Sequence, residues 1–139
     1  MEKAKLLIVE DEGIVALDLT NRLRGLGYTV SAVVSSGEKA VQTASETHPD
    51  LVLMDIRLKT NMDGIEAARE IYARFDIPVV YLSAMADDDT KQRANAALHF
   101  GYILKPFDER ELHATIQKAL YRHHADREST TPTIDQRQS

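Results

Sequence analysis

Five polar side chains of this sequence follow directly after short apolar runs. Glu10 and Asp11 follow LLIV, Asp55 follows LVLM, Ser83 follows VVYL, and Lys105 follows YIL. Carboxylates held close together repel one another, and a divalent cation such as Mg²⁺, which prefers oxygen ligands, relieves that repulsion. A hydroxyl and an ammonium group beside them suit phosphoryl oxygens. The set is therefore typical of metal-assisted phosphoryl transfer in which one carboxylate is the nucleophile.

The elements that must position these residues alternate along the chain. Apolar runs predict strands at residues 6–9, 29–34, 51–54, 79–82 and 102–104. Amphipathic stretches between them predict helices at residues 14–26, 37–47, 64–75, 88–98 and 109–124. This alternation indicates an α/β fold with a parallel sheet covered by helices. In such a sheet the ligand crevice lies outside the carboxyl ends of the strands, so we expect the five side chains to converge at one edge.

Local signals mark the helix ends. A Ser or Asp followed three residues later by Glu has the spacing of a capping box, and it occurs at Ser35–Glu38, Asp63–Glu66 and Asp108–Glu111. Gly25 and Gly27 predict the end of the first helix. The helix at 88–98 has few large apolar residues and is the least strongly indicated of the five.

Composition limits the classes of protein. The 139 residues suit one domain, predicted at 1–124, followed by a polar segment at 125–139 that we expect to be a disordered tail or the start of a linker. A net charge of −5 argues against direct nucleic-acid binding, and the absence of cysteine excludes thiolate chemistry. The apolar runs are too short to cross a membrane. The N-terminus has no signal-peptide pattern, so we expect a cytoplasmic protein without membrane association.

Each polar residue also has a simpler interpretation. Asp11 or Glu12 could cap the following helix, Ser83 could cap a turn, and Lys105 could be a solvated charge. These interpretations stay open for any one residue. Their combination, in this order and each at a strand end, favours one shared site.

In that order the motifs resemble the receiver domain of two-component response regulators, the CheY-like phosphoacceptor family, over about residues 4–122. The resemblance implies a three-layer, doubly wound (βα)5 flavodoxin-like sandwich with a five-stranded parallel sheet in the order 2-1-3-4-5. It also implies that Asp55 is the phosphoacceptor. Glu10, Asp11, Asp55 and the backbone carbonyl of Arg57 would hold Mg²⁺ or Mn²⁺, with Asp11 favoured over Glu10 as a direct ligand.

The resemblance implies further roles around the phosphoryl group. Ser83 would bind the phosphoryl group, Lys105 would pair with it, and Ala84 would leave the pocket open. The Lys105–Pro106 peptide is a candidate for the cis form. Tyr102 lies at the position of an aromatic switch that moves together with Ser83, although it could instead be a strand-edge aromatic that packs on the last helix.

The expected function is that of a signalling module. A sensor histidine kinase or phosphotransfer protein would phosphorylate Asp55, and the phosphorylated chain would change the face that binds its partner. The module would be a stand-alone receiver or a fragment of a longer regulator, and a homodimer through the face around Tyr102 stays open. We expect no enzymatic activity beyond self-phosphorylation from small donors and self-dephosphorylation.

Two alternatives belong to other classes. An aspartyl-phosphate phosphatase-type hydrolase generally places a second Asp two residues after the nucleophile, where this sequence has Arg57. A flavodoxin-like cofactor carrier would need a hydroxyl- and glycine-rich turn after the first strand, where this sequence has VEDEG. Both are therefore less favoured than the receiver.

Overall fold

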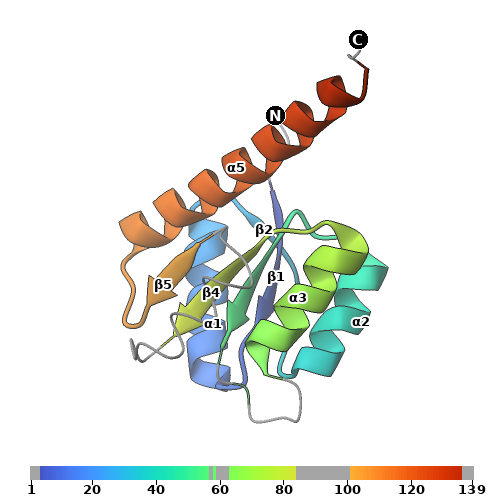
Figure 1. Ribbon diagram of the computed structural model, residues 1–139. Coiled ribbons are helices and arrows are strands. Elements are labelled where there is room, and N and C mark those ends of the chain that lie inside the picture. Colours follow the sequence, from blue (N-terminus) through green and yellow to red (C-terminus); the bar gives the residue numbers. More distant parts are fainter. Residues whose placement is uncertain (1–3, 57, 59–62, 84–100, 136–139) are drawn as a thin grey trace.

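The computed structural model describes residues 4–56, 58, 63–83 and 101–135 (Figure 1). Its centre is a sheet of five strands that are parallel wherever they pair, in the order β2-β1-β3-β4-β5. The strands are β1 (Lys5–Val9), β2 (Thr29–Val34), β3 (Leu51–Asp55), β4 (Val79–Ser83) and β5 (Tyr102–Leu104). The predicted fold class, strand positions and strand order are confirmed.

The central strands are buried along their whole length or nearly so. All residues of β3 and β4 are buried, as are the last four of β1. A strand in a parallel sheet is covered on both faces, so its sequence is a continuous apolar run rather than an alternating one. These runs place Glu10, which follows β1, and Asp55 and Ser83, which end β3 and β4, at the boundary between the core and solvent.

Helices cover both faces of the sheet (Figure 1). They are α1 (Gly13–Gly25), α2 (Gly37–Thr47), α3 (Gly64–Phe75) and α5 (Glu109–Asp135). The helices α2 and α3 pack against each other. On the other side, α5 is joined to the end of α1 by an Arg22–Glu109 ion pair of 3.9 Å, and the Tyr28 hydroxyl lies 2.9 Å from His113 Nδ1. The predicted helix at 88–98 lies outside the described residues.

Two of the three predicted helix starts are as expected. Asp63 and Glu66 form a complete capping box, and Asp108 accepts a hydrogen bond from the backbone of Glu111 at 2.7 Å. The prediction for α2 is wrong by one residue. The cap is Ser36 rather than Ser35, because α2 begins at Gly37 and the Ser36 hydroxyl accepts from the backbone amide of Lys39.

The last helix is longer than predicted. It is anchored on the sheet by Leu112, Ile116 and Ala119, which are fully buried, and His123 lies 3.0 Å from Asp76 at the end of α3. Instead of ending at His124, it continues to Asp135. Polar composition indicated disorder because it offers nothing to bury, but extending an existing helix needs no burial and costs far less than nucleating one. The backbone is thus helical at residues 125–135, where a disordered tail or linker start was expected over 125–139, and residues 136–139 lie outside the described residues.

Among the described residues, no helix combines the length and the apolar character that a membrane-spanning segment requires.

The two faces of α1 differ sharply in burial, and this generates a stability prediction. Leu23 is fully buried, whereas Leu17 is 63% exposed. We expect Leu23→Ala to lower the free energy of unfolding by about 2–5 kcal/mol, since it leaves a cavity in the core. The matched change Leu17→Ala should alter it by less than about 0.5 kcal/mol. Urea unfolding measures both, and equal losses would contradict this orientation of α1.

Candidate functional site

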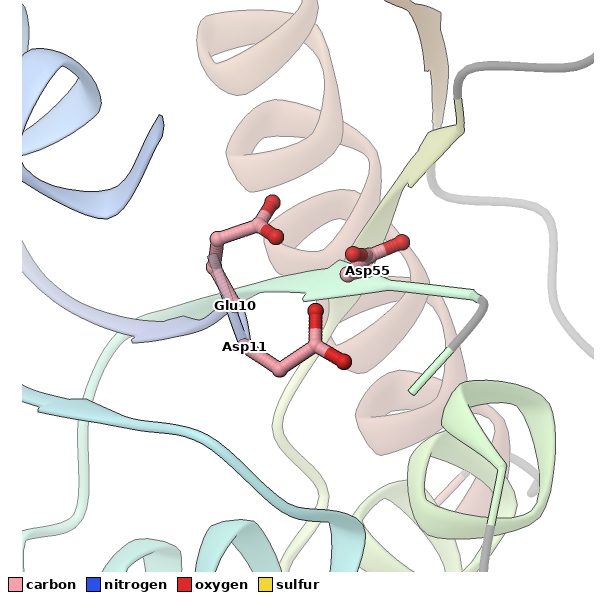
Figure 2. A group of neighbouring side chains, drawn as sticks. All are labelled: Glu10, Asp11 and Asp55. Atoms are coloured by element: carbon pink, nitrogen blue, oxygen red, sulfur yellow. The ribbon is translucent and has the colours of Figure 1, made fainter. Parts of the chain in front are cut away.

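Three carboxylates converge at the carboxyl edge of the sheet (Figure 2). Glu10 and Asp11 follow β1, and Asp55 is the last residue of β3, which pairs with β1. One carboxylate oxygen from each of the three lies within 4.8 Å of the others. Glu10 and Asp55 are buried, and Asp11 is partly exposed. The structure thus brings together the side chains that the sequence proposed as metal ligands.

Lys105 is the cation of this cluster. It follows β5, and its Nζ lies 2.7 Å from Glu10 Oε1 and 3.5 Å from Asp55 Oδ2. Its backbone amide donates to the carbonyl of Ser83 at 2.7 Å, and the Lys105–Pro106 peptide is cis, as the resemblance suggested. Lys105 is therefore a partner of the acids and not a solvated charge.

The charges of the cluster keep Lys105 protonated. Burial lowers the pKa of Lys105, but the hydrogen bond to Glu10 and the negative charges of Asp55 and Glu10 raise it by more. The net result is a pKa above the usual value for lysine. Three carboxylates and one ammonium group leave a formal charge of −2 at this edge. That excess suits one divalent cation.

The carboxylate of Glu10 is held by two partners, Lys105 and the backbone amide of Glu12. Its side chain has no exposed surface, and besides Lys105 it accepts a hydrogen bond from the backbone amide of Glu12 at 3.2 Å. Glu12 occupies the cap position of α1, but its side chain makes no capping hydrogen bond. Capping by Glu12 therefore does not account for the acidic run, and the Glu12 amide is a contributor to the site that the sequence reasoning missed.

Ser83 and Tyr102 lie on β4 and β5, which are neighbours at one side of the strand order. Ser83 ends β4, is almost fully buried, and is paired in register with Leu104. Tyr102 begins β5, is paired with Tyr81, and is partly buried. These positions place Ser83 at the same sheet edge as Asp55. Arg57 and Ala84 lie outside the described residues, so their proposed roles stay predictions.

The donor set fits Mg²⁺. All three side chains offer hard oxygen atoms, and ligands on opposite sides of a Mg²⁺ ion are about 4 Å apart, since each Mg–O bond is about 2.0–2.1 Å. Adjacent ligands are closer, about 3 Å apart, so side-chain adjustment would bring the three carboxylate oxygens, now within 4.8 Å of one another, onto one ion. The residues that would hold the ion are Glu10, Asp11 and Asp55.

Sequence reasoning also missed Gly64, the first residue of α3. Its backbone amide donates to the carbonyl of Ile56 at 3.0 Å, next to Asp55. In the sequence, Gly64 follows the capping residue Asp63, which indicates a helix start and says nothing of what the helix touches.

Comparison with known proteins agrees with this geometry. A family model described as the response regulator receiver domain matches residues 6–117. The transcriptional regulatory protein PdtaR of Mycobacterium tuberculosis is 37% identical over 118 residues, which are 85% of this chain and 57% of the relative. The phyllosphere-induced regulator PhyR of Methylorubrum extorquens is 34% identical over 119 residues, 84% of this chain and 43% of the relative. The chain thus spans about half the length of these relatives.

Solved structures give the same result. The receiver domain of the sensor histidine kinase PA1611 from Pseudomonas aeruginosa PAO1, with a magnesium ion coordinated in its active site cleft, has a TM-score of 0.77 and 33% identity, covering 86% of this chain and 98% of that one. The signal receiver domain of a modulated diguanylate cyclase from Desulfovibrio desulfuricans G20 has a TM-score of 0.85 and 35% identity, covering 90% of this chain and 99% of that one. With its fold, its acidic edge and these matches, the chain belongs to the family of response regulator receiver domains.

Proposed function

We propose that this chain accepts a phosphoryl group on Asp55 in a Mg²⁺-dependent reaction and that phosphorylation changes its binding to a partner. The observation that carries the proposal is the cluster at the sheet edge. Asp55 is only 5% exposed, lies within reach of Glu10 and Asp11, and has the Lys105 ammonium group 3.5 Å away. A buried carboxylate beside both a cation and a divalent-metal site can react as a nucleophile toward a phosphoryl group, whose negative charge would otherwise repel it.

The residues divide the reaction among them. A carboxylate oxygen of Asp55 attacks phosphorus as the bond from phosphorus to the donor breaks, and the electron pair of that bond leaves with the donor. Lys105 pairs with the phosphoryl oxygens, and the Ser83 hydroxyl donates a hydrogen bond to them. Glu10, Asp11 and Asp55 would hold Mg²⁺, whose charge would offset that of the phosphoryl group. The product is an aspartyl phosphate on the chain itself, so the chain is a switch and not a catalyst for external substrates.

The donor would be a sensor histidine kinase or a phosphotransfer protein carrying a phosphohistidine. Such a donor must reach Asp55 from the solvent side of the sheet edge. Ile14 and Leu17 are 86% and 63% exposed, and they lie one helical turn apart on α1, next to the acidic residues. These exposed apolar side chains support docking of the donor beside α1. Because phosphohistidine is made from ATP by the kinase, we place the reaction in the cytoplasm.

The output would be a protein contact through the surface around Tyr102. Tyr102 is partly buried at the start of β5, beside α5, where a ring can move between two packings. The same face could bind a second copy of the chain. A net charge of −5 supports protein rather than nucleic-acid contact by this domain.

The decisive experiment is phosphorylation by a small donor. Incubation with acetyl phosphate and Mg²⁺ should add the mass of one phosphoryl group, and EDTA should block the addition because the acidic cluster would lack its cation. Asp55→Asn should abolish labelling. Intact-mass spectrometry measures all three.

Asp18→Asn is the matched control, since it removes one carboxylate from the exposed face of α1. It should be labelled like the wild type. Labelling that survives Asp55→Asn would move the phosphoacceptor to another residue.

Lys105 generates a pH-dependent prediction. In EDTA at pH 7, Lys105→Met should lower the free energy of unfolding by about 1–3 kcal/mol, because the buried Glu10 carboxylate loses its charged partner. The pKa of Lys105 is raised in the folded state, so its contribution is fully present below the unfolded value of 10.5 and is lost as pH rises through the folded value. The difference between wild type and variant should therefore shrink above pH 10.5.

Urea unfolding at several pH values measures this difference. Lys118→Met, on the exposed face of α5, is the control and should have little effect at any pH. A loss for Lys105→Met that is absent at pH 7, or that grows above pH 10.5, would contradict the ion pair.

If the donor docks beside α1, a change on α1 should slow transfer from a protein donor without slowing labelling by a small-molecule donor. Ile14→Asp should slow transfer from a phosphorylated kinase or phosphotransfer protein at least tenfold, because it places a charge in the apolar contact. Its labelling by acetyl phosphate should stay within twofold of the wild type. Rapid-quench measurement of both rates makes the comparison, and equal slowing of both would show damage to the site itself.

A further inference from the structure

The first residue of α3 lies against the backbone of the phosphoacceptor. A Cβ atom built on Gly64 would lie 2.2 Å from the carbonyl oxygen of Asp55, 2.8 Å from the Cα of Ile56 and 3.0 Å from the carbonyl carbon of Asp55. All of these are backbone atoms, so no side chain can rotate away to make room. At Gly64 only hydrogen fits.

The need for glycine here concerns space and not conformation. Gly64 does not have the positive φ that Gly27 has, and its helical backbone is open to any residue. Gly13 is the first residue of α1, in the equivalent place after β1, and a Cβ atom added there would have nothing within 4 Å. The start of α3 therefore lies closer to the end of its preceding strand than the start of α1 does.

Both sides of this contact are fixed. On the strand side, the amide of Ile56 donates to the carbonyl of Leu82 at 3.0 Å, which holds the end of β3 against β4. On the helix side, the amide of Gly64 donates to the carbonyl of Ile56 at 3.0 Å, and Asp63 caps the helix. The backbone of Asp55 and Ile56 thus lies between β4 and the start of α3.

We propose that Gly64 is a positioning residue for Asp55, holding the acceptor carboxylate at its distance from Glu10, Asp11 and Lys105. The inference rests on the proposed function, because it concerns how the proposed acceptor is aligned. Any side chain at Gly64 would force the helix start and the strand end apart by about 1 Å, and displacements of that size in a reacting group can cost up to about 100-fold in rate. Since the metal ligands include Asp55, the same shift would weaken Mg²⁺ binding.

The experiment compares Gly64→Ala with Gly25→Ala, which adds the same methyl group to an exposed helical position with nothing within 4 Å. Mg²⁺ affinity is measured from amide chemical shifts in ¹⁵N-labelled protein, at a temperature well below the thermal unfolding midpoint of each variant. The rate of labelling by acetyl phosphate is measured at saturating Mg²⁺. We expect Gly64→Ala to weaken Mg²⁺ binding at least fivefold and slow labelling at least tenfold, and Gly25→Ala to stay within twofold of wild type.

The Mg²⁺ measurement separates positioning from stability. If Gly64→Ala only lowers the unfolding midpoint while Mg²⁺ affinity and labelling stay at wild-type values, α3 alone has moved and the inference is wrong. If Gly64→Ala does not fold, Asp63→Ala decides, since it loosens the start of α3 without adding an atom. We then expect a two- to fivefold loss of Mg²⁺ affinity, and an unchanged affinity overturns the inference.

Failure of the proposed function looks different. In that case the wild-type chain itself is not labelled by acetyl phosphate, and the Mg²⁺ titrations of the wild type, Gly64→Ala and Gly25→Ala still decide whether Gly64 positions Asp55.

Discussion

Repulsion among three carboxylates is the constraint on which the rest of this structure depends. Glu10, Asp11 and Asp55 are held with their oxygens within 4.8 Å of one another, and two of them are buried. Lys105 offsets part of the repulsion through its 2.7 Å contact with Glu10, and although burial lowers the pKa of Lys105, the neighbouring carboxylates raise it by more. The remaining negative charge suits a divalent cation, which under the proposed function would also offset the charge of a phosphoryl group.

Carboxylates that repel one another stay close together only if the backbone that carries them is rigid. The support comes from β1 and β3, which are neighbours, are buried on both faces, and end at the same edge. Placing Glu10 and Asp55 at the ends of such strands makes their backbone positions as well determined as those of the core. Asp11, one residue farther from β1 than Glu10, is partly exposed.

Sequence patterns were sufficient for the frame of the molecule and for the identity of the clustered residues. Continuous apolar runs such as Leu51–Met54 predict buried parallel strands, and the rule that crevices lie at carboxyl strand ends brings Asp55 and Lys105 together from positions far apart in the chain. These inferences succeeded because they depend on periodicity and topology. Neither requires knowledge of which atoms touch.

The wrong cap of α2 and the contacts that the sequence did not reveal depend on interactions that composition does not encode. Ser35 and Ser36 are equally good caps by type, and only the direction in which the chain approaches α2 selects Ser36. That Lys105 contacts Glu10 more closely than Asp55 depends on side-chain reach across strands that are not neighbours. The contact of Gly64 with the carbonyl of Asp55 depends on how closely a helix approaches a strand, which a sequence does not state.

The length of α5 has a mechanical consequence. His123 of this helix contacts Asp76 at the end of α3, and the helix then continues to Asp135, away from the sheet (Figure 1). At about 1.5 Å per residue, the helix from His123 to Asp135 is roughly 18 Å long. If the part of α5 that packs on the sheet tilted by about 10°, the end of a rigid helix of that length would move by about 3 Å. A small rearrangement near Tyr102 that tilted α5 would thus cause a larger displacement at Asp135 than at Tyr102 itself.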